Sequence, residues 1–183
     1  MTHDYAPHAL DIAAFCKAQL SLTGDNELIE YARVNPEGIA LDGGGAQLVC
    51  WRAQGRTPKD AAGRDELWLD LHIETAVPQI CQRCLQPAMV ALEIDRSFRF
   101  VADEQMAATL DDVSDHDVLV ISRRFDLHEL IEDEILMALP LVPRHEVCPV
   151  QVRWTVEDAD YERAQKESKR NPFAALGDLK KKD

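Results

Sequence analysis

Two short pairs of metal-binding residue types constrain this chain more than any other feature. Cys81-Gln82-Arg83-Cys84 places two thiols three positions apart, and His145-Glu146-Val147-Cys148 repeats the spacing about sixty residues later, between two prolines. Each spacing lets one backbone turn aim two side chains at one point, as in a four-ligand zinc site. The sequence therefore predicts that folding brings Cys81, Cys84, His145 and Cys148 together around a structural zinc ion. The alternative, a set of buried or idle thiols, stays open at this point.

The residues on both sides of the cysteine pair alternate between apolar and polar, as in strands with one buried face. The apolar positions are Leu67, Leu69, Leu71, Ile73 and Val77 before the pair, and Val90, Leu92, Ile94, Phe98 and Phe100 after it. Two such strands around a short connection predict an antiparallel hairpin over 67–78 and 88–101, with the cysteines near its turn as in a zinc knuckle. Arg96 interrupts the second apolar row, which indicates a bulge or a sheet edge.

Helical periodicity occurs in two places. Apolar residues recur every three or four positions over 126–139, where Asp126 can cap the helix and Pro140 ends it. A shorter stripe predicts an N-terminal helix over 11–22, which Gly24 then breaks. The fold class is therefore α+β: an antiparallel sheet with the 126–139 helix packed on it and a short helix at the N-terminus.

The remaining segments are interpreted as connections. Residues 53–66 and the acidic stretch 103–117 are expected to be loops, and 118–121 is expected to be a short strand. The domain organisation that follows is one α+β domain over 1–155 and a charged, partly ordered tail over 156–183.

Composition limits the partners. Of 183 residues, 33 are acidic and 20 basic, which gives a formal net charge of −13. A protein of this charge is repelled by phosphate backbones unless it segregates a basic patch, so a basic protein is the better electrostatic match. Five cysteines without a secretory leader indicate reduced thiols in a cytoplasm, and no apolar run approaches the length of a membrane span.

Two segments are candidates for binding such a partner. The helical block contains three consecutive acidic residues, Glu132, Asp133 and Glu134, which spread over about 200° of the helix circumference. They predict a solvated acidic face or a docking face for a basic partner. Asn171-Pro172-Phe173, followed by Leu176, is a short apolar motif that could dock as one face; a partly ordered tail is an equally open interpretation.

Enzymatic alternatives find less support. No nucleophile elbow, zinc-protease or phosphate-loop motif occurs, so no small-molecule substrate is expected. A thiol-redox protein could use Cys81 and Cys84, but such a pair normally begins a helix that lowers the thiol pKa, and here strand-like alternation follows. Arg83 lies between the two thiols and could donate a hydrogen bond to a thiolate. We expect it instead to be an exposed turn residue.

Four blocks then occur in one order: the Cys81–Cys84 pair after a strand, the helical block from Leu130 to Pro140, His145 with Cys148, and Asn171-Pro172-Phe173-Ala174 near the end. The ordered set resembles the bacterial YceD family of large ribosomal RNA subunit accumulation proteins. The resemblance implies a cytoplasmic, non-enzymatic role in the synthesis, processing or stability of large-subunit (23S) ribosomal RNA. One departure is Leu85, which stands where some relatives have Gly.

Combined with the acidic charge, the resemblance favours a ribosomal protein or a pre-ribosomal large-subunit particle as the partner. Direct contact with naked RNA is the weaker alternative, because the basic clusters are small, Arg123-Arg124 and Lys180 to Lys182, and no aromatic RNA-recognition motif occurs.

Overall fold

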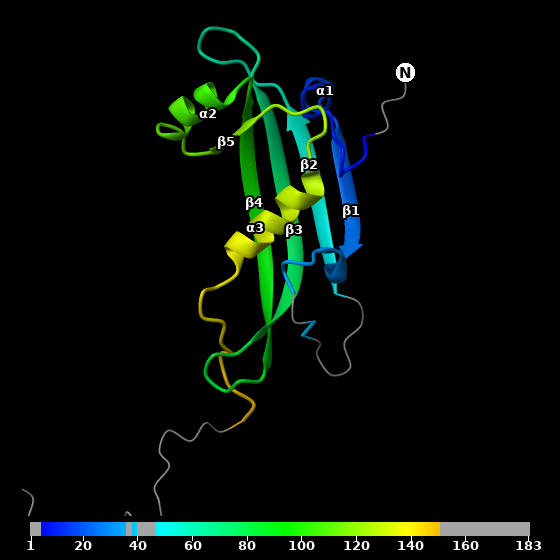
Figure 1. Cartoon of the computed structure of the whole chain (residues 1–183), viewed down its shortest axis with the longest axis vertical. Helices are drawn as coiled ribbons and strands as arrows, with labels where there is room; N and C mark the ends of the chain where they lie inside the picture. The colour runs from blue at the N-terminus through cyan, green and yellow to red at the C-terminus, as the bar shows by residue number, and fades with distance from the viewer. Residues whose placement is uncertain (1–4, 36–37, 40–46, 151–183) are drawn as a thin grey trace, which may run out of the picture. The chain divides into compact units, whose positions relative to one another are not determined.

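The computed structural model describes residues 5–35, 38–39 and 47–150. One five-stranded sheet has the order β1-β2-β3-β4-β5 (Figure 1). Its strands are β1 (Ser21–Glu27), β2 (Leu48–Arg56), β3 (Leu67–Ile80), β4 (Pro87–Val101) and β5 (Asp117–Val120). The helices are α1 (Ile12–Lys17), α2 (Glu104–Asp111) and α3 (Leu127–Ala138), with a 3-10 turn, η1, at Leu28–Glu30.

All these elements belong to the first of two units into which the chain divides, Met1–Cys148 and Pro149–Asp183. The predicted domain boundary between residues 155 and 156 lies outside the described residues and stays a prediction. None of the helices in the described ranges is long and apolar enough to cross a membrane.

The predicted hairpin is confirmed. β3 and β4 pair antiparallel without interruption from Leu67 opposite Phe100 to Ile80 opposite Pro87. β1 and β2 extend the antiparallel order, whereas β5 pairs parallel to β4. The α+β class is therefore confirmed, with a mixed rather than a wholly antiparallel sheet.

The acidic stretch 103–117 is not a simple loop, because α2 occupies half of it. Asp103 Oδ1 accepts a hydrogen bond from the Met106 N–H at 2.8 Å, so this carboxylate caps the helix. A parallel pairing of β4 with β5 needs a crossover connection, and the segment containing α2 provides it. The short strand expected at 118–121 is confirmed one residue earlier as β5.

α1 is shorter than the predicted 11–22 helix because a Schellman motif ends it after Lys17. Gln19 has φ of 51°, its N–H donates to the Cys16 carbonyl at 3.0 Å, and the Leu20 N–H donates to the Phe15 carbonyl at 3.3 Å. The chain can then turn directly into β1, which takes the residues assigned to the end of the helix.

Gly24 lies in the middle of β1, opposite Trp51 of β2, and is not a helix breaker. A Cβ at this position would come within 2.6 Å of the Trp51 ring. The Trp51 Nε1–H donates to Asn26 Oδ1 at 2.8 Å, which fixes the indole over the strand. Glycine is required here because the backbone of β1 and the indole approach each other closely.

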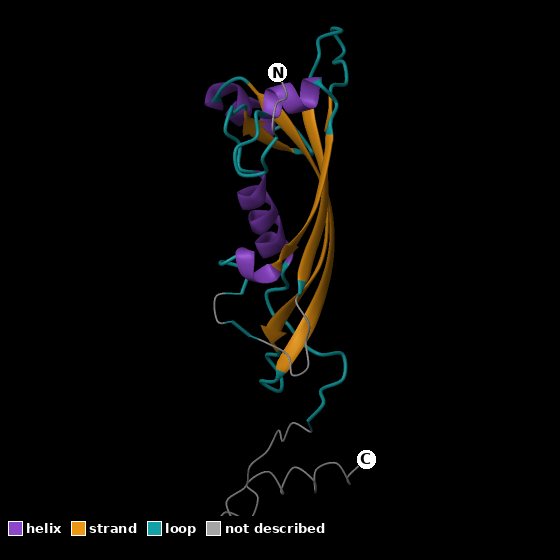
Figure 2. Cartoon of the chain, turned by 90° about the vertical axis from the view of Figure 1, so that its right-hand side faces the viewer, coloured by secondary structure: helices purple, strands orange, loops and turns teal. Residues whose placement is uncertain are grey.

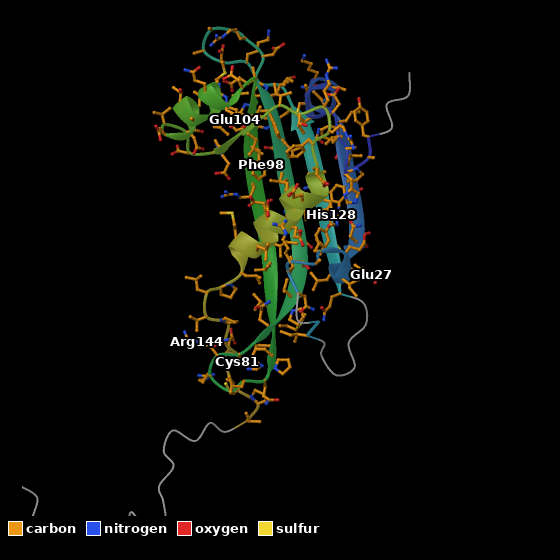
Figure 3. All side chains as sticks on the ribbon, in the orientation of Figure 1. Glu27, Cys81, Phe98, Glu104, His128 and Arg144 are labelled. Carbon is orange, nitrogen blue, oxygen red and sulfur yellow. The ribbon has the colours of Figure 1, made fainter. Side chains whose placement is uncertain are left out.

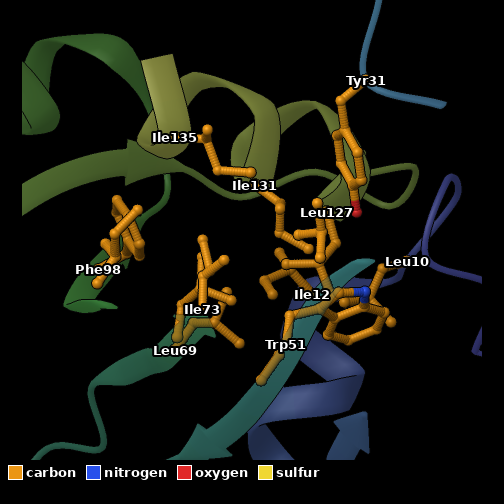
Figure 4. Packing of buried hydrophobic residues seen from close by; sticks show 14 of the residues in the cluster. Leu10, Ile12, Tyr31, Trp51, Leu69, Ile73, Phe98, Leu127, Ile131 and Ile135 are labelled. Atoms are coloured by element: carbon orange, nitrogen blue, oxygen red, sulfur yellow. The ribbon is translucent and has the colours of Figure 1, made fainter. Parts of the chain in front are cut away.

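The core lies between the sheet and the helices, which all stand on one side of it (Figure 2). Leu127, Ile131 and Ile135 of α3 are completely buried in one cluster with residues of β2, β3 and β4 (Figure 4). The predicted packing of this stripe onto the sheet is confirmed. At the end of the sheet beyond α3, the β3–β4 hairpin continues to the cysteine pair.

Candidate metal centre

The tip of the β3–β4 hairpin meets the segment that follows α3 (Figure 3). Cys81, Cys84, His145 and Cys148 converge there, and one ligand atom from each lies within 4.8 Å of all the others. The Sγ atoms of Cys81 and Cys148 are 3.9 Å apart, and Cys84 Sγ lies 3.4 Å from His145 Nδ1. Folding thus brings together all four residues that the spacing selected.

The Cys81–Cys148 and Cys84–His145 separations match those around a tetrahedral zinc ion. Zinc bond lengths to sulfur and nitrogen place two sulfur ligands about 3.8 Å apart, and a sulfur and a nitrogen about 3.6 Å apart. The ring of His145 is oriented correctly, because its Nε2–H donates to the Pro87 carbonyl at 3.0 Å and leaves Nδ1 facing Cys84. The cysteines are free thiols, so the cluster is not a disulfide.

The backbone builds the site from two sides. Within the hairpin tip, the Leu85 N–H donates to the Cys81 carbonyl at 2.8 Å and closes the turn that carries both thiols. Between the two segments, the Gln82 N–H donates to the carbonyl of Pro143, which is buried, at 2.9 Å. The proline-rich segment is thereby held in place before His145 and Cys148 follow.

Arg83 is a linking residue and not the exposed turn residue that we expected. Its Nε donates to Cys148 Sγ at 3.0 Å, and its terminal nitrogen donates to the carbonyls of His145 at 2.9 Å and Glu146 at 3.2 Å. A guanidinium on a thiolate is the kind of partner that orients a metal ligand from outside the coordination shell.

One thiol of the site, Cys81, differs in acidity from the thiol in the core, whereas burial raises the pKa of Cys84 as it does that of Cys16. Burial opposes ionisation of Cys81, but the backbone N–H groups of His145, Arg83 and Cys84 outweigh it and bring the pKa down to about 5. Burial raises the pKa of Cys16 to about 11, and its Sγ donates to the Trp68 carbonyl at 3.1 Å. Cys16 is thus a core residue, while Cys81 favours the thiolate that binds metals.

Residues 69–180 match the family model described as "Large ribosomal RNA subunit accumulation protein YceD". The chain belongs to the YceD family. A protein of Haemophilus influenzae with that same name is 36% identical over 104 residues, which are 56% of this chain and 59% of the relative. The chain therefore matches less than two thirds of that YceD protein's length. No solved structure matches the chain.

Leu85 lies in the turn that carries the two thiols of this YceD-family site, and its backbone conformation is one that favours glycine. Its φ is 60°, and its side chain is 69% exposed, so it contributes little burial. A left-handed conformation costs an L-residue about 1–2 kcal/mol. Leu85→Gly should therefore raise the free energy of unfolding by about 0.5–1 kcal/mol in urea titrations, after allowance for the greater entropy of glycine in the unfolded chain.

Gln86→Gly is the matched control for that substitution. Gln86 is exposed in the same turn, and its φ is not positive. Glycine there should lower the free energy of unfolding by about 0.5–1 kcal/mol. An equal loss in both variants would show that Leu85 stores no strain.

The acidic face predicted on α3 is wrong for two of its three residues. Glu132 and Glu134 are buried, and only Asp133 is half exposed. Glu132 accepts from the backbone N–H of Arg33 at 2.7 Å and from its Nε at 2.8 Å, and Asp133 pairs with the same guanidinium at 2.8 Å. Glu134 pairs with Arg96 Nε at 3.1 Å. These carboxylates hold α3 against its neighbours inside the protein.

The same contact explains why Arg96 interrupts the apolar row of β4. The strand has no bulge there, since its register with β3 is unbroken, but Arg96 does lie on a stretch of β4 that β5 does not reach, as the edge alternative predicts. Arg96 instead faces α3 and neutralises Glu134, and it also pairs with Asp117 at the start of β5. The remaining candidates for partner binding, Asn171, Pro172 and Phe173, lie outside the described residues and stay a prediction.

Proposed function

We propose that this protein is a non-enzymatic factor of the cytoplasm that supports the accumulation of large-subunit (23S) ribosomal RNA. The observation that carries the proposal is the family match, which spans the hairpin, α3 and both halves of the candidate metal centre. The relative from Haemophilus influenzae is named for accumulation of this RNA. The function is proposed to lie in binding and not in a reaction.

The candidate metal centre supports a structural role for zinc. Four protein side chains are available, so a tetrahedral ion held by Cys81, Cys84, His145 and Cys148 has no open position for water or substrate. Closed four-ligand sites of cysteine and histidine stabilise folds, whereas catalytic zinc keeps one position open. When bound, the ion would tie the hairpin tip to the segment after α3.

A thiol-redox function has one observation in its favour, the lowered pKa of Cys81. Two others oppose it. Cys81 is completely buried, which keeps oxidants and disulfide partners away from the sulfur. The residues after Cys84 enter the strand β4 and not the helix that such pairs normally begin. We therefore retain the metal-ligand role for the pair.

A ribosomal protein or a pre-ribosomal large-subunit particle is the partner class that the charge favours. The net charge is −13, and many of the cations in the described ranges are already paired with carboxylates. These include Arg33, Arg56, Arg64, Arg96 and Arg99. Affinity for a polyanion depends on free cationic contacts, so a basic protein surface is the better match.

Depletion of the protein in its own cells tests the function. Large-subunit RNA should fall relative to small-subunit RNA, and re-expression should restore the ratio. Affinity capture from lysates treated with nuclease should still recover a basic ribosomal protein, because the contact is proposed to be protein to protein. An equal fall in both RNAs would contradict the function, and capture abolished by nuclease would contradict the partner class.

A further inference from the structure

β4 presents a long open edge. The strand runs from Pro87 to Val101, but β5 pairs only with Phe98–Val101. Over residues 87–97 the described part of the chain places β3 on one side of β4 and no strand on the other (Figure 1). Such an edge exposes unpaired backbone groups and is a template for another strand.

Two hydrogen bonds show which backbone groups face outward. The Val101 carbonyl accepts from the Ile121 N–H at 2.9 Å, and the Pro87 carbonyl accepts from His145 Nε2 at 3.0 Å, so both point away from β3. The register between them is unbroken, and backbone direction in a strand repeats every two residues. The outward N–H and C=O groups therefore belong to Met89, Ala91, Glu93, Asp95 and Ser97.

The two sides of this edge differ in chemistry. On the sheet face away from the helices, Glu93 lies opposite Glu74, and the Asp95 side chain is 75% exposed although it pairs with His72 Nδ1 at 2.7 Å. His72 Nε2 also contacts Glu74 at 3.1 Å, so three carboxylates share one imidazole on this face. On the helix side, Met137 is 75% exposed and follows Glu134 of α3 by one helical turn. Since Glu134 contacts β4 through Arg96, Met137 lies on the same side of α3. The edge is thus acidic on one face and flanked by an apolar side chain on the other.

We propose that the β4 edge, residues 89–97, binds an extended basic segment of a partner protein as an added strand. Side chains of an added strand alternate between the two faces, so basic residues meet Glu93 and Asp95 while apolar residues face Met137. The inference rests on the proposed function only in taking the partner to be a protein. It adds the binding surface on this protein, and it adds an alternating basic and apolar sequence in the segment of the partner.

Charge argues against a second copy of this chain on the same edge. Antiparallel pairing of two β4 edges brings Glu93 and Asp95 of one copy close to the same residues of the other, and like charges across strands are destabilising. The acidic face equally disfavours a nucleic acid, whose phosphates carry the same sign of charge.

Amide exchange by NMR tests the inference with an acetylated, amidated peptide of four Lys-Val repeats. The outward amides of Ala91, Glu93 and Asp95 should exchange rapidly in the free protein and about tenfold more slowly with saturating peptide, because they gain hydrogen bonds. The amides of Val90, Leu92 and Ile94 face β3 and should not change. Protection that is absent from the outward set would overturn the proposal.

Two controls separate strand addition from attraction between charges. A Lys-Val peptide with every backbone amide methylated keeps its charge but cannot donate, and it should give no protection. Ala91→Pro removes one outward N–H without touching the β3 ladder, and should weaken binding about fivefold, as expected for one hydrogen bond. Ala91→Val keeps the N–H and should bind like the wild type.

Each other outcome has a definite meaning. Equal binding of the methylated peptide would show that charge alone attracts the probe, and the edge proposal would be wrong. Protection of the outward amides without peptide, rising with protein concentration, would show that a second copy occupies the edge. Neither result changes the ratio of ribosomal RNAs after depletion, so failure of the edge proposal and of the proposed function are distinguishable.

Discussion

Protein purified without chelator is expected to contain about one equivalent of zinc, and removing the ion should unfold the hairpin tip. Apart from the four ligands, the tip is joined to the segment after α3 by the Gln82 to Pro143 bond, the hydrogen bonds of Arg83 and the bond from His145 to the Pro87 carbonyl. Structural zinc contributes on the order of 10 kcal/mol to the folding of small peptides. The effect on global stability should be smaller here, because the sheet and α3 have a core of their own.

Metal content and amide exchange measure this effect together. After chelation, or in Cys84→Ser, the amides of Cys81, Gln82 and Leu85 should lose protection while those of β3 near Leu69 keep it. Cys50→Ser is the matched control, because Cys50 is a free thiol on β2 outside the cluster and should leave zinc binding unchanged. A metal-free preparation whose melting and tip protection equal those of the wild type would defeat the zinc assignment.

The parts of the fold that follow from local patterns were predictable. Period-two alternation identified β3 and β4, and the cap at Asp126 with the stripe of Leu127 and Ile131 identified α3, because each signal lies within one element. The ligand set was predictable for a similar reason. Each half of the site is a pair of ligands close together in the sequence, Cys81 with Cys84 and His145 with Cys148. Only the approach of the two pairs to each other depends on the fold.

Two of the errors share a cause, since each depends on a partner far along the chain. Gly24 looks like a breaker until Trp51 of β2 is placed against it. Glu132 looks solvated until Arg33, ninety-nine residues earlier, is placed beside it. Helix α1 ended early for a different reason: Gln19 takes a left-handed conformation that usually signals glycine, so the sequence contained no visible stop.

Glu132→Lys should lower the free energy of unfolding by about 3 kcal/mol, since breaking a buried ion pair leaves an uncompensated charge. Glu132 is 8% exposed and accepts from the backbone N–H, Nε and terminal nitrogen of Arg33. Lysine would set a second cation against that guanidinium and leave the backbone N–H without its acceptor. The loss is placed at the lower end of the range for buried pairs because the Arg33 side chain is 49% exposed.

Urea unfolding followed by circular dichroism measures the loss, with Glu129→Gln as the control. Glu129 is exposed on the same helix, so its substitution should change stability by less than about 0.5 kcal/mol. If Glu132→Lys unfolds at the same urea concentration as the control, its carboxylate is solvated and the acidic docking face on α3 is restored as a hypothesis.

Glu134→Gln should behave differently from Glu132→Lys, although Glu134 is equally buried. Burial raises the pKa of Glu134 despite the opposing charge of Arg96, so desolvation outweighs the ion pair. A neutral amide removes that desolvation penalty, while Arg96 keeps Asp117 as a partner, and stability at neutral pH should change by less than about 1 kcal/mol.

Because the folded pKa of Glu134 is raised, the contribution of its carboxyl group to stability is present below its ordinary pKa and is lost as pH rises through the folded value. Urea titrations from acidic to neutral pH should therefore show Glu134→Gln gaining on the wild type as pH rises; a gain in the opposite direction would mean that Arg96 dominates the site.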